Sequence, residues 1–346
     1  MTIINFDKAS AEIVRLAYLT EKYPPLISEL PSGGIVYAKD SFFAKYGKAA
    51  LKKLTSREEE YCTEPFFASR FMLNTLFESQ LLFNDEPYTK VDFDDFLVAD
   101  RDILILNQRL VSYGSQVVGL NLMCSNCEVD LEKESIKIEN YEIERLDPES
   151  CRQFKPNSNE FFYRSPDKKW SIVFRLLTVK DERELIESSD YEIYGGGYPM
   201  MAALQKTIIA LNGELDKSKI WEMILNDEFP IKECMRFQNY VRRFTPFVRI
   251  ISEDMSCKQC GQKNQIRADV DLNLLSMNSS VVRDILIEEM FWLHRQLRLS
   301  HGDLYDMPLD FRKRLFRREL KRLEDEKKEM ENRKANPQRP SISSQR

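Results

Sequence analysis

The hydrophobic periodicity of the chain switches between helical and extended segments, and it does so twice in the same order. In each half, a Leu-Thr dipeptide and acidic residues precede helical periodicity, and an extended run then leads to a Cys-x-x-Cys pair. A Val-Asp-Leu tripeptide follows each pair, at Val129–Leu131 and at Val270–Leu272. We interpret this shared order as a diverged internal duplication, which predicts two related halves of mixed helix and strand.

Helix boundaries are marked by capping signals. Thr55 and Thr178 are candidate N-caps, with Glu58 and Asp181 at the capping-box position three residues later. Gly114 has the position of a helix C-cap. Residues 30–37 read as a Pro-Ser-Gly-Gly turn between extended pieces. Helical periodicity predicts further helices over 69–83, 101–114, 198–215 and 219–228.

From residue 279 the periodicity becomes helical throughout. One apolar stripe contains Val282, Ile285, Leu286, Met290, Leu293 and Leu297, and Pro308 suits the first turn of a second helix. That second helix is highly charged, with Glu324–Lys328 and Glu329–Arg333 at the favourable i,i+4 spacing. Its apolar side is narrow and consists of Phe311, Leu315, Phe316, Leu320 and Leu323. Such a helix is marginal alone, so we expect it to lie against another surface.

The two cysteine pairs carry the main chemical signal. They are Cys124 with Cys127 and Cys257 with Cys260. A two-residue gap lets both thiolates of one turn bind the same ion, which leaves two tetrahedral corners for a second pair. Compact zinc ribbons space their pairs by about 15–20 residues, but equivalent positions in two related halves could face each other. We therefore predict one Zn²⁺ bound by all four; the alternative is two unrelated pairs of thiols.

This zinc site is expected to be structural. Four cysteine ligands close the coordination sphere, whereas a catalytic zinc keeps one position open. Cys62, Cys151 and Cys234 have no partner at ligand spacing and read as structural thiols. The predicted fold is therefore α+β, with two related mixed halves joined by the zinc site and a C-terminal helical extension. The predicted segments are an N-terminal helix and linker at 1–29, halves at 30–150 and 151–278, the extension at 279–334 and a disordered tail at 335–346.

Composition argues against an enzyme. The 346 residues include only two histidines, His294 and His301, so the commonest catalytic acid and base is nearly missing. Both read as structural histidines. No nucleophile motif accompanies them, and we predict no enzymatic activity.

The chain lacks an apolar stretch long enough to span a bilayer, and it lacks the basic start typical of a signal peptide. We therefore expect no membrane association, and we expect an intracellular location.

Two charged segments offer weaker signals. The acidic run from Asp92 to Asp102 lacks the central glycine and final glutamate of a calcium loop, which favours a solvated loop and helix start. The basic cluster from Arg312 to Arg322 could form a nucleic-acid stripe. However, the same helix turns acidic at Glu324 and the net charge of the chain is −5, so an exposed or partner-facing helix is favoured.

Several short motifs stand in order from about Leu30 to Leu320. The first half contains LPSGG, LTSREEE, ADRDILILNQRLVSYG and CSNC. VFRLLTVKDERELIE, CKQCG and the C-terminal FWLHRQLRLSHGDLYDMPLDFRKRLFRREL follow. In these motifs and their order, the sequence resembles the baseplate hub and hub-assembly family of T-even-type contractile-tail bacteriophages.

The resemblance implies a non-enzymatic protein of tail morphogenesis, either a hub subunit or an assembly chaperone for the hub. The four paired cysteines match the family's cysteine motifs and would be the zinc ligands. Partners would be other hub or tail proteins, met in the host cytoplasm and, for a subunit, retained in the virion. We expect the partner-binding face to include Phe311, Leu315, Phe316 and Leu320. The alternative is a zinc-ribbon nucleic-acid-binding accessory protein of a phage. That alternative requires a basic surface around the zinc, whereas the residues beside the cysteine pairs are mixed or acidic.

Overall fold

The computed structural model divides the chain into two compact units. Unit 1 comprises Met1–Lys53 and Pro65–Met277, and unit 2 comprises Leu54–Glu64 and Asn278–Arg346. The residues it describes are 26–51, 53–62, 93–118, 123–129, 135–147, 155–187, 200–226, 228–252, 254–265, 267–270, 274 and 280–335. Helices and strands are mixed within the chain, as the predicted α+β class requires.

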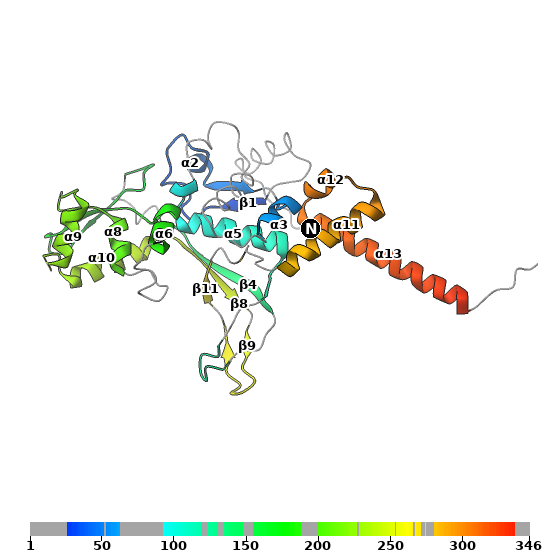
Figure 1. The fold of residues 1–346 in the computed structure, drawn as a ribbon. Coiled ribbons are helices and arrows are strands. Elements are labelled where there is room, and N and C mark those ends of the chain that lie inside the picture. The colour runs from blue at the N-terminus through cyan, green and yellow to red at the C-terminus, as the bar shows by residue number, and fades with distance from the viewer. Residues whose placement is uncertain are drawn as a thin grey trace, which may run out of the picture. The chain divides into compact units, whose positions relative to one another are not determined.

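Unit 1 contains a four-stranded antiparallel sheet that carries the cysteine pairs at one end. Its order is β11-β8-β4-β3. Because β4 runs antiparallel to β8, the β3–β4 and β8–β11 connections leave the sheet at the same end (Figure 1). Each connection carries one Cys-x-x-Cys pair. The strands are β3 (Gln116–Val118), β4 (Ser135–Glu144), β8 (Phe247–Ser252) and β11 (Arg267–Asp269).

Helix α5 (Val98–Tyr113) packs against β8 and against β1 (Leu26–Glu29). Residues 103–106 of α5 are all buried, which explains their continuous apolar run. Strand β1 pairs antiparallel with β2 (Lys48–Leu51). The predicted C-cap at Gly114 is confirmed, with a positive φ of 78°.

The turn at residues 30–37 is fastened to the start of α5. The carboxylate of Asp100 accepts hydrogen bonds from the Ser32 N–H at 2.9 Å, the Ser32 hydroxyl at 2.6 Å and the Tyr37 hydroxyl at 2.5 Å. A side chain at Gly34 would place its Cβ 1.9 Å from the carbonyl oxygen of Phe43, in α2 (Phe42–Tyr46). Only glycine therefore fits at the second position of the Gly-Gly turn.

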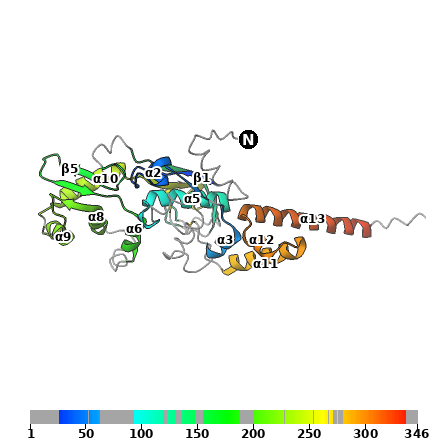
Figure 2. The ribbon, with the colours of Figure 1, turned by 90° about the horizontal axis from the view of Figure 1, so that it is seen from above.

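A second sheet in unit 1 has the order β5-β6-β7. Its strands are β5 (Phe161–Arg164), β6 (Ser171–Phe174) and β7 (Ile208–Leu211), and its helices are α6 (Val179–Ile186), α8 (Met200–Thr207), α9 (Lys217–Leu225) and α10 (Ile231–Phe244). Helices α8 and α9 contact β7. Figure 2 shows α8, α9 and α10 gathered near β5 of the same sheet. The helix predicted over 198–215 is wrong beyond Thr207, because Ile208–Leu211 forms β7. Two consecutive isoleucines favour a strand, and β6 supplies the pairing partner.

The predicted capping signals are present. Thr178 caps α6 with a complete capping box, in which its side chain accepts from the Asp181 N–H and Asp181 accepts from the Thr178 N–H. Before α3 (Ser56–Cys62), Glu58 accepts a hydrogen bond from the Thr55 N–H at 2.8 Å. The helices predicted within 1–25 and 69–83, together with the tail after 335, lie outside the described residues.

Three of the four described carboxylates of the acidic run are buried, which corrects the expectation of a solvated segment, whereas Asp95 is exposed. Asp94, in the short helix η2 (Phe93–Asp95), pairs with Arg183 at 2.7 Å. Asp102 pairs with Arg101 at 2.7 Å, and Asp94, Asp100 and Asp102 are each less than 10% exposed. Asp94 is paired by an arginine of α6, and Asp100 accepts hydrogen bonds from the turn at residues 30–37. Sequence spacing does not reveal these distant partners. Asp92 lies outside the described residues.

Unit 2 joins α3 to the three C-terminal helices, α11 (Ser280–Leu297), α12 (His301–Tyr305) and α13 (Leu309–Ala335). Sequence analysis placed the α3 segment in the first half. Leu286, Met290 and Leu293 of the predicted stripe form the core with Leu304 and Met307. Ile285 is 53% exposed and does not belong to that core, whereas the Val282 side chain is not described.

A buried arginine links α13 to α3 and corrects the expectation of an exposed basic cluster. Arg312 is 1% exposed and donates to the Ser56 hydroxyl at 2.6 Å, to Glu59 at 2.5 Å and to Glu289 at 3.1 Å. A buried guanidinium needs such partners because desolvation of an unpaired charge is costly. The other end of the cluster is exposed, at Arg317, Arg318 and Arg322.

The described helices include none that is both long enough and apolar enough to cross a membrane.

Candidate metal centre

The first cysteine pair lies in a tight turn between β3 and β4. The Cys124 N–H donates to the Val129 carbonyl at 2.9 Å, and the Glu128 N–H donates to the Cys124 carbonyl at 3.0 Å. Glu128 adopts a left-handed φ of 56°, which is unusual for a residue with a side chain. The turn therefore directs the cysteine side chains to one side at some conformational cost.

The second pair repeats this geometry at the same offsets. The Cys257 N–H donates to the Gln262 carbonyl at 2.8 Å, and the Gly261 N–H donates to the Cys257 carbonyl at 2.9 Å. Gly261 has a φ of 72° and occupies the position of Glu128. Short strands β9 (Met255–Ser256) and β10 (Lys263–Asn264) pair on either side of this turn.

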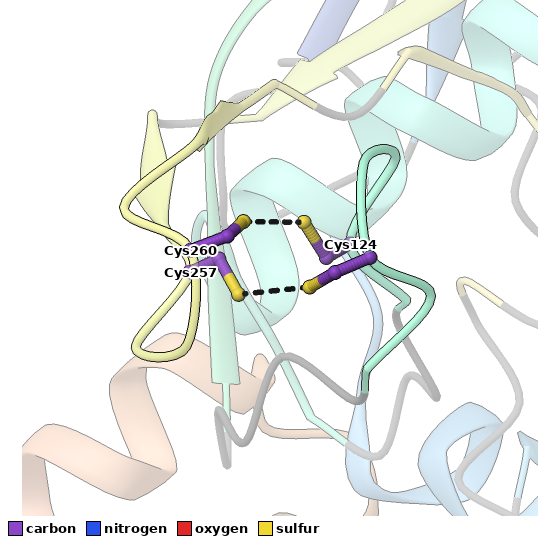
Figure 3. Close-up of side chains that lie close together, drawn as sticks. Cys124, Cys257 and Cys260 are labelled. Carbon is purple, nitrogen blue, oxygen red and sulfur yellow. Dashed lines mark hydrogen bonds between the residues drawn. The ribbon is translucent and has the colours of Figure 1, made fainter.

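The two turns bring their four sulfur atoms together. The Sγ atoms of Cys124 and Cys260 are 3.6 Å apart, as are those of Cys127 and Cys257 (Figure 3). All four sulfurs lie within 4.8 Å of one another. Within the part of the chain that the structure describes, no other group of three or more His, Cys, Asp or Glu side chains is gathered in this way.

The separations fit a tetrahedral metal site. A Zn–S bond of about 2.3 Å implies sulfur–sulfur edges of about 3.8 Å, close to the observed 3.6 Å. A disulfide would require about 2.05 Å, and these thiols are free. Cys124 and Cys257 are buried, Cys127 is half-buried and Cys260 is exposed, so one edge of the cluster faces solvent.

Backbone amides prepare two of the thiols to ionise. Hydrogen bonds from the N–H groups of Asn126 and Cys127 lower the pKa of Cys124 to about 6. The pKa of Cys260 is lowered by the Gln262 N–H and by the Asn126 side chain. The Val129 N–H lowers the pKa of Cys127, but burial and the neighbouring thiols outweigh it and raise that pKa to about 12. A cation would favour the thiolate form of all four.

Asn264 connects the two turns beside the sulfurs. Its side-chain oxygen accepts hydrogen bonds from the N–H and hydroxyl of Ser125, and its side-chain nitrogen donates to the Gln262 carbonyl at 3.0 Å. The same nitrogen lies 3.6 Å from the Cys124 Sγ. Sequence reasoning missed this residue. The feature that marks Asn264 as part of the site is the burial of its polar side chain, which is 7% exposed. That burial is known only from the structure.

The remaining candidate residues lie elsewhere. Cys62 and Cys234 are buried apart from the four-sulfur cluster, and Cys151 is outside the described residues. His294 and His301 stack at 6.0 Å between ring centroids on the surface of unit 2, and the His294 Nδ1 lies 2.6 Å from the Leu299 carbonyl oxygen.

The four residues expected to bind a partner divide into two pairs. Phe311 and Leu320 are 42% and 40% exposed. Leu315 and Phe316 are half-buried against the core of unit 2, and the Phe316 ring meets Trp292 edge-on at 5.3 Å. Of these four residues, Phe311 and Leu320 therefore leave the most apolar surface exposed.

Comparisons with protein-family models, with curated proteins and with solved structures found no match for this chain.

Proposed function

We propose that Cys124, Cys127, Cys257 and Cys260 bind one structural Zn²⁺. The observation that carries the proposal is the cluster of four sulfurs, all within 4.8 Å of one another, built from two turns with the same hydrogen bonds. Zinc favours four thiolate ligands, whereas magnesium and calcium favour oxygen. The ion would join the β3–β4 connection to the β8–β11 connection at one end of the sheet. The two cysteine pairs in these connections are about 130 residues apart in the chain.

The same ligand set supports a brace more than a reaction centre. Four cysteines would leave no position for water or substrate, and no histidine lies within the group. The duplication remains part of the proposal, because each cysteine turn connects two strands of one sheet and uses the same two backbone hydrogen bonds. We propose on these grounds that the chain has no enzymatic activity.

The biological role that we propose is non-enzymatic phage tail morphogenesis, as a baseplate hub subunit or a hub assembly chaperone. Its support is the ordered set of motifs from LPSGG to the C-terminal helices. Phe311 and Leu320, partly exposed at two separate positions on α13, provide apolar surface for protein contacts. The charged residues beside the cysteine turns include both acids and bases, among them Glu128 and Lys258, which does not favour the nucleic-acid alternative.

Deletion of the gene in the encoding phage tests this role. We expect filled or empty heads to accumulate without baseplates in electron micrographs of infected cells, and complementation with the wild-type chain to restore them. Complete tails in the deletion strain would refute the role in morphogenesis. Mass spectrometry of purified particles then distinguishes the two forms, because a hub subunit remains in the virion and a chaperone does not.

A further inference from the structure

A hollow on unit 1 lies between α10 and the turn that joins β5 to β6. Its volume is about 290 Å³, and its lining residues are Tyr163, Pro166, Arg236, Asn239, Tyr240 and Arg243. The rings of Tyr163 and Tyr240 lie 4.9 Å apart, and Tyr163 also packs on Phe237 at 5.5 Å. These contacts hold the aromatic wall in place, so the hollow is a preformed feature of the surface.

The rim of the hollow is basic, although the whole chain is acidic. Arg243 is exposed and forms no ion pair with any residue among those described. Arg236 forms an ion pair with the buried Glu233, one helical turn earlier in α10. The turn next to Pro166 exposes Lys168 and Lys169 together with Asp167, so its charge is also positive on balance. An anionic group that enters the hollow would therefore meet Arg243 as a cation not yet neutralised by a carboxylate.

The neighbouring strip of α10 is apolar. Ile231 and Met235, one helical turn apart, are 62% and 53% exposed. Arginine, tyrosine and methionine are the residue types enriched where proteins meet. A nucleic-acid strand could use the arginines and stack on the tyrosines, but its phosphates would gain nothing from Ile231 and Met235. The combined surface fits an acidic peptide that also carries apolar side chains.

We propose that this surface binds an acidic, partly apolar segment of a partner protein. Carboxylates of the segment pair with Arg243 and Arg236, and its apolar side chains cover Met235 and Ile231 and fill the aromatic hollow. The surface is separate from the α13 residues to which the proposed function assigns partner binding, and the inference stands without that role.

Selection of a displayed library of random short peptides against the full-length chain tests the proposal. We expect enriched peptides to combine acidic residues with apolar or aromatic ones. For a labelled peptide of this kind, fluorescence anisotropy should show binding weakened about tenfold or more by Arg243→Glu and by Met235→Asp. Arg295→Glu, a charge reversal at an exposed position in unit 2, should leave the affinity unchanged.

Other results would overturn the proposal. These are enrichment without acidic residues, no enrichment at all, or equal loss of binding in the Arg243→Glu and Arg295→Glu variants. Labelled oligo-dT that binds the chain, competes with the peptide and is lost with Arg243→Glu would identify a nucleic-acid surface instead. If Arg243→Glu disturbs the fold by circular dichroism, Arg243→Gln replaces it, since it removes only the charge.

Discussion

The side-chain oxygen of Asn264 accepts two hydrogen bonds from Ser125, one from the backbone N–H at 2.9 Å and one from the hydroxyl at 2.8 Å. These residues belong to different cysteine turns and are 139 positions apart. The link orients the first turn while the Asn264 nitrogen approaches the Cys124 sulfur. Asn264 thus supports the metal ligands without being one.

Replacement of Asn264 by alanine should weaken zinc binding about 10–100-fold, the usual effect of losing a residue that orients metal ligands. Competition with a chromophoric chelator measures the affinity. Gln265→Ala is the control, because Gln265 is exposed and its side-chain nitrogen donates a hydrogen bond to Asp254, at 3.4 Å, rather than to a cysteine turn. Equal affinities in the two variants would show that Asn264 has no part in the site.

Replacement of Cys257 by serine should abolish the zinc and loosen unit 1. We expect about one zinc per wild-type chain and close to none in the variant, by elemental analysis of protein purified without added metal. A structural zinc supplies on the order of 10 kcal/mol, comparable with the whole stability of a domain. Limited proteolysis should therefore cut unit 1 of the variant faster than the wild type.

Cys62→Ser is the matched control for the zinc prediction. Cys62 is also buried, but it lies in α3 of unit 2 and apart from the four-sulfur cluster. The Cys62→Ser variant should retain full zinc content and the wild-type protease pattern in unit 1. Two zinc ions per wild-type chain, or no metal with all four thiols readily alkylated in the native protein, would contradict the shared site.

Replacement of Arg312 by methionine should destabilise unit 2 by about 3–5 kcal/mol, because Glu59 and Glu289 would lose their buried cation. Arg314→Met should cost no more than about 1 kcal/mol, since its ion pair with Asp310 is largely exposed. Urea unfolding followed by circular dichroism compares the two. A similar loss in both variants would mean that the buried network contributes little.

Phe311 and Leu320 are the two candidate partner-binding residues to test, because Leu315 and Phe316 pack against the core of unit 2. If the proposed role is right, Phe311→Asp with Leu320→Asp should leave unit 2 folded and reduce binding to purified baseplate hub proteins, because both side chains are partly exposed. Charge reversal at Arg317 and Arg318 should have a smaller effect, since exposed charges contribute little. Truncation of α13 is a poor test, because it removes Arg312 from the buried network. The reverse order of effects would favour the nucleic-acid alternative.

The stability of unit 1 should depend on the titration of Asp102. Burial raises its pKa to about 7 despite the opposing effect of Arg101. The unfolded chain releases this proton near pH 4 and the folded chain only near pH 7, so the stabilising contribution is present below pH 4 and is lost as the pH rises to 7. The change is at most about 4 kcal/mol.

Asp102→Asn should flatten this dependence. Unfolding free energies measured by urea at pH 5 and pH 8 should differ less in the variant than in the wild type. Asp167→Asn is the control, because Asp167 is exposed and its pKa is lowered by the Ser165 hydroxyl and the Lys169 N–H. An unchanged slope in Asp102→Asn would show that Asp102 is already ionised at pH 5.

Local sequence signals identified the features that depend on near neighbours. Thr178 and Asp181 form the predicted capping box, and the two-residue cysteine gap indicates turns that can each present two sulfurs. Features created by distant segments were not predictable. Nothing near Arg312 indicates that a helix 256 positions earlier will bury it, and Ile208 begins a strand only because β6 lies beside it.

The membership of α3 in unit 2 also affects how the chain is made. Ser56 and Glu59 leave the ribosome long before Arg312, so the nascent chain carries α3 without its final partners while unit 1 is completed. During that interval Leu54 and Cys62, both fully buried in the finished protein, lack the C-terminal helices that complete their unit. A product that stops before residue 278 would expose this segment permanently. The interleaved order thus leaves an incomplete chain with an apolar segment that cellular proteases can attack.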